Sequence, residues 1–121
     1  MVKQKYFTLF FVVWFCVILF LSVIPDNSPD SIKINIYEFR LDYLKHFLVY
    51  LPLGFTLLSI KGKSSVFLTL VGLFVASVPE CIQYFLLYRT FNPIDLFSNA
   101  LGFIFGLWLF SFLSKKTKIF N

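Results

Sequence analysis

Seven polar side chains interrupt three of the four apolar runs of this chain, at spacings that align them on helical faces. They are Asp42, Lys45 and His46, then Glu80 and Gln83, and finally Asp95 and Asn99. Carboxylates and an imidazole can move protons or hold a charged ligand. Inside a bilayer such groups are costly, so their presence there marks a candidate functional site.

The last apolar run carries a stripe of polar and small residues. Asp95, Asn99, Gly102 and Gly106 are spaced four, three and four residues apart, which places them on one face of a helix. The two glycines at the inner end allow a second helix to approach closely. We expect Gly102 and Gly106 to form a helix contact, either within one chain or between the copies of an oligomer.

The polar ends of the three runs are predicted to meet in one layer of the outer leaflet, because consecutive antiparallel spans alternate in direction. Tyr50 flanks this layer and Arg89 lies at its rim. The candidate ligand-binding residues are therefore Asp42, Lys45, His46, Tyr50, Glu80, Gln83, Arg89, Asp95 and Asn99. His46 and Glu80 lie deepest, roughly one to two helical turns from the outer surface, and are the candidate acid and base groups.

The layer is nearly balanced in charge. Three carboxylates stand against Lys45 and Arg89, and a protonated His46 would bring the formal sum to zero. Buried charges persist when they are paired and hydrogen-bonded, so the balance predicts a mutually paired network. Two interpretations stay open: a closed structural network, and a cavity that opens outward.

Some of these residues also have structural roles available to them. Asn92-Pro93 is a good helix opening, which leaves Asp95 in a first turn where a carboxylate is favourable. Asp42 starts its own helix in the same way. The two cationic side chains can act as interfacial anchors, and polar contacts between helices can serve only to hold the helices together.

The elements that position these residues are transmembrane helices. The chain of 121 residues is 59% hydrophobic and 14% charged, with a mean hydropathy of +0.83. Soluble domains carry about 25% charged residues. The apolar runs predict spans at about 6–24, 42–60, 64–87 and 93–113. We predict an all-α polytopic membrane protein, a single domain over residues 1–121 that forms a four-transmembrane-helix bundle.

The first run is predicted to be a span rather than a signal peptide. It is longer than the usual apolar region of about 7 to 15 residues, and it ends without a small-x-small cleavage pattern. The following segment, residues 26–41, is the only sizeable loop that the sequence predicts. Its alternating isoleucines at 32–36 are typical of a short interfacial strand or of an extended segment that lies at the lipid headgroups. Cys16 and Cys81 lie inside apolar runs, so neither a disulfide framework nor a metal site is predicted, and no cofactor is implied.

Basic residues mark one side of the predicted bundle. They precede the first span, occupy the turn between the second and third spans, and follow the last span: Lys3, Lys5, Lys61, Lys63, Lys115, Lys116 and Lys118. Because lysine and arginine accumulate on the cytoplasmic side, we expect both termini to face the cytoplasm. The net charge of +5 therefore follows membrane topology, and a nucleic-acid partner is not expected.

The polar motifs resemble those of the VanZ-like family in order and spacing. The matching segments are Asp42 to Gly54, Glu80 to Gln83, Arg89 to Asp95, and Asn99 to Gly102 with Gly106. Many family members have a lysine directly after the first aspartate, where this chain has Tyr43 and places its lysine at Lys45 instead. The resemblance implies a small protein of the bacterial inner (plasma) membrane, related to one associated with low-level teicoplanin resistance.

Three kinds of function fit these features. The first is a non-enzymatic envelope protein that lies in the lipid bilayer and handles a lipid-linked cell-wall precursor or glycopeptide-like ligand at the outward polar site. The second is a membrane enzyme that acts on a lipid phosphate or ester, with His46 and Glu80 as acid and base. The third is a small transporter or accessory subunit, although four helices without an internal repeat leave little room for alternating access.

Overall fold

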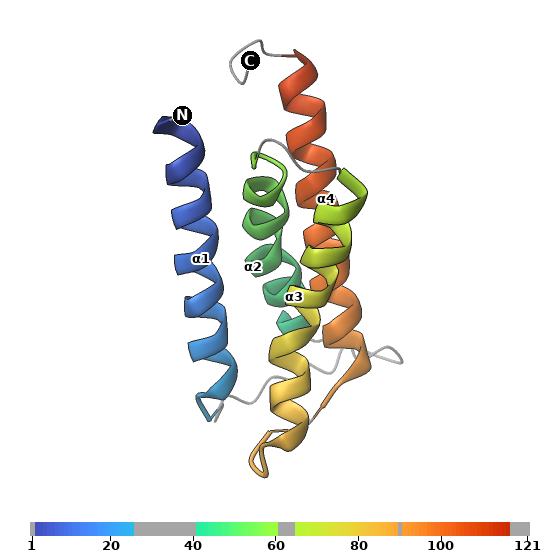
Figure 1. Cartoon of the computed structure of the whole chain (residues 1–121). Coiled ribbons are helices and arrows are strands. Elements are labelled where there is room, and N and C mark those ends of the chain that lie inside the picture. The colour runs from blue at the N-terminus through green and yellow to red at the C-terminus, as the bar shows by residue number, and fades with distance from the viewer. Residues whose placement is uncertain (1, 26–40, 61–64, 90, 117–121) are drawn as a thin grey trace.

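The protein is built from helices. The computed structural model describes residues 2–25, 41–60, 65–89 and 91–116. Its helices are α1 (Val2–Val23), α2 (Leu41–Leu57), α3 (Ser65–Phe85) and α4 (Pro93–Lys116) (Figure 1). The all-α prediction is confirmed. The strand or extended segment predicted at residues 32–36 and the turn predicted at residues 61–63 lie outside the described residues.

Three of these helices are long and apolar enough to cross a membrane: Gln4–Val23 in α1, Ser65–Phe85 in α3 and Pro93–Lys115 in α4. Their outer faces expose large apolar side chains such as Phe74, Phe85 and Trp108. So much exposed apolar surface is typical of a protein that contacts lipid. The chain is therefore a membrane protein.

The remaining helix, α2, is shorter than the span that the sequence predicts there. It has 17 residues, so at about 1.5 Å per residue it is roughly 25 Å long, against about 30 Å for a hydrocarbon core. It ends at Leu57, where the backbone N–H groups of Ser59 and Ile60 turn back to the carbonyl oxygens of Thr56 and Leu57. That tighter hydrogen-bonding pattern closes the helix three residues before the predicted end.

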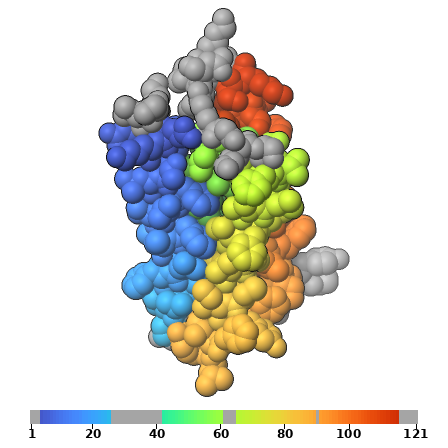
Figure 2. All heavy atoms as spheres, viewed as in Figure 1, coloured from blue at the N-terminus to red at the C-terminus, as the bar shows by residue number. Residues whose placement is uncertain are grey.

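Two helices, α2 and α3, each contact all of the other three, and the most extensive contact in the bundle is between α2 and α4. Figure 1 shows α2 between α1 and α4, and in Figure 2 the atoms of α1 and α3 cover most of it on the viewed face. Its buried side chains Tyr50, Leu53 and Leu57 pack with Phe103 of α4, which is fully buried. The apolar core is therefore organised around α2.

Glycines bring α2 and α4 into backbone contact. A Cβ atom at Gly102 would overlap the carbonyl oxygen of Phe47, and one at Gly106 would overlap that of Leu51. Gly54 on α2 lies in the same way against the carbonyl oxygen of Phe103. The glycine stripe of α4 is thus used within the chain, which is one of the two alternatives that the sequence left open. An oligomer would need another surface.

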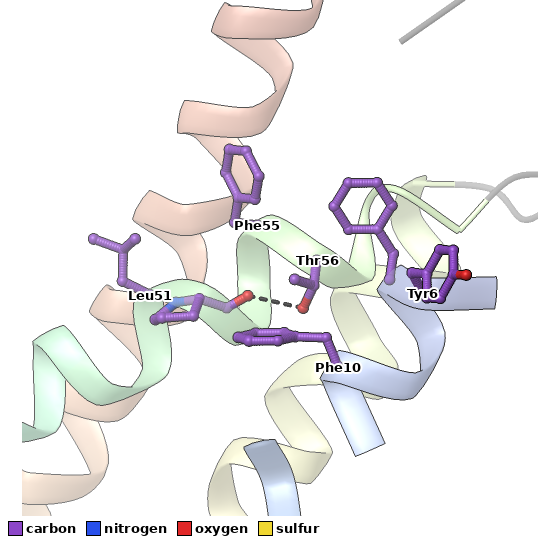
Figure 3. Close-up of a pocket in the computed structure, with 7 residues that line it drawn as sticks. Tyr6, Phe10, Leu51, Phe55 and Thr56 are labelled. Atoms are coloured by element: carbon purple, nitrogen blue, oxygen red, sulfur yellow. Dashed lines mark hydrogen bonds between the residues drawn. The ribbon is translucent and has the colours of Figure 1, made fainter. Parts of the chain in front are cut away.

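The first helix is attached more loosely. Trp14 donates its ring N–H to the carbonyl oxygen of Val49 at 2.8 Å, which joins the middle of α1 to α2. Nearer the N-terminus, an apolar groove of about 610 Å³ separates the two helices (Figure 3). Its lining comes from α1 and α2 alone: Tyr6, Phe7, Phe10, Leu51, Pro52, Phe55 and Thr56. The hydroxyl of Thr56 is bonded to the backbone of its own helix, because it donates to the carbonyl oxygen of Pro52 at 2.8 Å.

Candidate functional site

His46 on α2 is the centre of polar contacts that come from three helices. Its Nδ1 lies 2.7 Å from Oδ1 of Asn99 on α4. An amide oxygen can only accept a hydrogen bond, so Nδ1 carries the proton and donates this bond. The side chain of His46 is 20% exposed, so part of the ring reaches the molecular surface.

Asn99 connects His46 to the most deeply buried carboxylate. The Asn99 side chain is fully buried, and its Nδ2 donates to Oε1 of Glu80 at 3.2 Å and to the carbonyl oxygen of Ala76 at 3.5 Å. Glu80 on α3 is 1% exposed, and its Oε1 also lies 3.6 Å from Nδ1 of His46. Its buried Oε2 has no hydrogen-bond partner among the described residues. Polar groups therefore run from the interior of the bundle to its surface.

Two further carboxylates face the other ring nitrogen. Oδ2 of Asp42 and Oδ2 of Asp95 each lie 3.9 Å from Nε2 of His46. Asp42 precedes His46 by one helical turn and its side chain is 17% exposed, whereas Asp95 is buried. We call the five side chains together the His46 cluster: Asp42, His46, Glu80, Asp95 and Asn99. The structure thus brings together five of the nine predicted ligand-binding residues.

Asp95 belongs both to the cluster and to a helix start. The predicted opening of α4 is present, because Oδ1 of Asn92 accepts a hydrogen bond from the backbone N–H of Ile94 at 3.0 Å. The carbonyl oxygen of Asn92 accepts the N–H of Asp95 at 3.1 Å, so Asp95 lies in the first turn. This cap fixes the backbone of Asp95 and places its carboxylate next to His46.

Two predicted site residues bind α1 instead. Gln83 donates to the carbonyl oxygen of Ser22 at 3.3 Å, and the guanidinium of Arg89 donates to those of Leu21, at 3.2 Å, and Ile24. Tyr88, which the sequence did not single out, donates to the carbonyl oxygen of Val23 at 2.6 Å. The last carbonyl groups of a helix have no partner inside the helix, and here the end of α3 and the turn after it supply those partners.

The position of Arg89 changes the expected charge balance. With its guanidinium turned toward α1, Arg89 contributes hydrogen bonds to that helix and not a charge within the cluster. The three carboxylates instead surround His46, whose ring nitrogens lie 3.6–3.9 Å from them.

Comparison with known proteins identifies the family of the chain. The VanZ/LLP1 family matches residues 7–114, which span all four helices. The chain belongs to the VanZ/LLP1 family. The resemblance seen in the polar motifs is confirmed, and the match extends it to α1. No curated protein and no solved structure matches the chain.

The two remaining predicted residues of this VanZ/LLP1 protein flank the His46 cluster. Tyr50 is almost fully buried on α2 and lies close enough to Glu80 to interact with it electrostatically. The side chain of Lys45 is exposed, one residue before His46. Tyr50 therefore belongs to the buried surroundings of the cluster, and Lys45 to its surface.

The cluster also brings together three side chains of metal-binding types, a grouping that the sequence did not predict. One ligand atom each from Asp42, His46 and Asp95 lies within 4.8 Å of the other two. Asp42 and His46 both lie on α2, and their spacing of one helical turn can be seen in the sequence. The third ligand comes from α4, and only the packing of α4 on α2 brings it to the pair.

Proposed function

We propose that this VanZ/LLP1 protein crosses the bacterial plasma membrane four times and uses the His46 cluster to bind a polar envelope ligand at the outer leaflet. The observation that carries the proposal is the chain of polar contacts from buried Glu80, through Asn99, to the partly exposed edge formed by His46 and Asp42. A network with one surface edge can receive a ligand. A network that only holds helices together does not need an edge at the molecular surface.

The membrane placement follows from the ends of the helices. Lys3 and Lys5 lie at the start of α1, Lys115 and Lys116 lie at the end of α4, and these two helix ends lie at the same end of the bundle (Figure 1). The positive charge puts that end in the cytoplasm, and the His46 cluster then faces outward. The short α2 completes a four-span topology, because its first turns are polar and reach the interface.

The chemistry of the cluster favours a ligand rich in hydrogen-bond donors. Carboxylates accept hydrogen bonds from sugar hydroxyls, amides and amines, and exposed Lys45 can pair with a phosphate or a peptide carboxylate. A sugar–peptide head group offers all of these groups. Lipid-linked cell-wall precursors and glycopeptide antibiotics share this chemistry, and the resemblance to proteins associated with teicoplanin resistance makes both relevant.

The proposal is tested by what the protein binds in cells. We would purify the wild type, His46→Ala and the control Ser98→Ala from a Gram-positive host that is sensitive to teicoplanin, and quantify the co-purified lipid-linked precursor by mass spectrometry. Ser98 is a buried neighbour of Asn99 that lies outside the cluster. We expect the precursor with the wild type and Ser98→Ala, and its loss with His46→Ala. Equal precursor in all three would contradict the proposal.

The link to resistance has its own measurement. Expression of the wild type in the same host is expected to raise the teicoplanin concentration that stops growth. Expression of His46→Ala, at an equal amount of protein in the membrane, is not expected to raise it. If the cluster variant protects as well as the wild type, resistance does not depend on the His46 cluster.

A second candidate function is catalysis on a lipid phosphate or ester. The observation in its favour is that His46 is held by Asn99 at Nδ1 and has two carboxylates near Nε2, as a positioned acid or base would. Purified protein would then release phosphate or free acid from polyprenyl phosphates or glycerophospholipids, and His46→Ala would not. Intact lipids after prolonged incubation with the wild type would exclude this candidate.

A further inference from the structure

Three metal-ligand side chains converge at the more exposed edge of the His46 cluster. Nε2 of His46 is 3.9 Å from the Oδ2 atoms of Asp42 and Asp95, too far for hydrogen bonds, which span about 2.7–3.2 Å. Atoms that share one zinc ion through bonds of about 2.0–2.2 Å lie roughly 3 to 3.6 Å apart. The three ligand atoms lie within 4.8 Å of one another, so side-chain shifts of up to about 1 Å would bring them to these distances.

The ring of His46 is oriented for coordination. Its Nδ1 donates to Oδ1 of Asn99 at 2.7 Å, which directs Nε2 at the two aspartates. Asn99 is itself fixed by Glu80 and by the backbone of α3. Metal-binding histidines almost always donate the other ring N–H to such a fixed acceptor. An unprotonated Nε2 would point its lone pair at two carboxylates, and a cation between the three groups turns that repulsion into attraction.

Glu80 adds a buried carboxylate on the other side of the His46 ring. Its side chain is 1% exposed, lies 3.6 Å from Nδ1 of His46, and has an Oε2 without a hydrogen-bond partner among the described residues. A buried carboxylate costs several kcal/mol unless it takes up a proton or positive charge compensates it. A divalent cation at Nε2 of His46 would supply positive charge close to this carboxylate.

We propose that Asp42, His46 and Asp95 bind one divalent cation of the zinc or manganese type. One imidazole nitrogen with two carboxylate oxygens suits these metals, whereas Mg²⁺ and Ca²⁺ favour ligand sets made of oxygen alone. Three protein ligands leave at least one coordination position for water or another ligand. The metal site goes beyond the proposed function and does not depend on it.

The test is a metal titration of the full-length protein in detergent. The protein carries Cys16→Ser and Cys81→Ser, because both thiols are exposed and would bind zinc themselves, and it is purified without a histidine tag. After treatment with a chelator and desalting, ZnCl₂ and MnCl₂ are titrated separately by calorimetry. We expect one ion of at least one of these metals per chain, and an increase in Tm when it binds.

Matched variants locate the ion. Asp95→Asn keeps the shape of the side chain, and we expect it to weaken binding by roughly tenfold or more and to abolish the increase in Tm. Asn99→Ala removes the hydrogen-bond partner of His46 and Glu80 but none of the three proposed ligands, and we expect a loss of about 10–100-fold. Gln83→Leu, which alters a polar residue that binds α1, is expected to bind like the parent protein.

Two results would overturn the metal proposal. One is the absence of saturable binding of either ion to parent protein whose helical content is intact by circular dichroism. The other is equal affinity in the parent protein, Asp42→Asn, His46→Ala and Asp95→Asn. The titration contains no envelope lipid, so either result leaves the proposed ligand function to its own test.

Discussion

At the scale of single residues, Asn99 determines how the cluster is arranged. Its amide joins His46 of α2 to Glu80 of α3, and each end of the amide group has the partner that its chemistry requires. The spacing of Asp95 and Asn99 predicted their common face correctly. The partners themselves depend on how three helices are rotated against one another, which a single sequence does not define.

Replacement of Asn99 by leucine should destabilise the fold, because His46 and Glu80 each lose a hydrogen bond inside the bundle. A buried polar group left without its partner costs about 1–3 kcal/mol. We expect the free energy of unfolding, measured by titration with sodium dodecyl sulfate, to fall by about this amount. Ser98→Ala is the control, and equal unfolding curves for the two variants would show that the Asn99 contacts contribute little.

At the scale of elements, the helices and their polar faces could be predicted from the sequence, but not every contact that the side chains on those faces make. Four apolar runs became four helices, and the stripe from Asp95 to Gly106 faces α2 as a close helix contact requires. The sequence predicts Gln83 and Arg89 in the ligand site, because Gln83 flanks the polar face of the third span and Arg89 lies at the rim of the polar layer. Both instead satisfy carbonyl groups at the end of α1, and no local pattern marks that contact.

The contact between α2 and α4 should be intolerant of any side chain at Gly102. A Cβ there would overlap the carbonyl oxygen of Phe47, so Gly102→Leu must push the two helices apart. Overpacking of a tight contact costs about 1–3 kcal/mol, and we expect an unfolding penalty in this range in the same detergent titration. Leu101→Ala, on the exposed face of the same helix, serves as the comparison. A Gly102→Leu protein as stable as Leu101→Ala would rule out the close backbone contact between α2 and α4.

The attachment of α1 can be tested separately. Arg89→Ala removes the donors to the carbonyl oxygens of Leu21 and Ile24, and hydrogen bonds from charged groups are worth about 1.5–3 kcal/mol. We expect faster amide hydrogen exchange near the C-terminal end of α1 and unchanged exchange around Asn99. Lys115→Ala provides the control for loss of a positive charge. Unchanged exchange in α1 would indicate that Arg89 does not hold this helix.

At the scale of the whole molecule, orientation decides what the cluster can reach. In a protein without its native cysteines, we would introduce Leu87→Cys, beyond the end of α3, or Lys115→Cys, near the end of α4. A membrane-impermeant maleimide should label position 87 in intact cells and position 115 only after permeabilisation, because lysine-rich ends stay in the cytoplasm. The reverse pattern would place the His46 cluster on the cytoplasmic side.

The central claim is that the His46 cluster binds a sugar–peptide envelope ligand, and the most direct test is affinity in a defined bilayer. The wild type and His46→Ala, each reconstituted in lipid nanodiscs, would be titrated with an undecaprenyl-linked disaccharide–pentapeptide, with teicoplanin and with phosphatidylglycerol. We expect saturable binding of at least one of the first two probes, weakened roughly tenfold or more by His46→Ala, since 1.4 kcal/mol corresponds to a factor of ten. No binding of either probe, or equal affinity in both proteins, would contradict the claim.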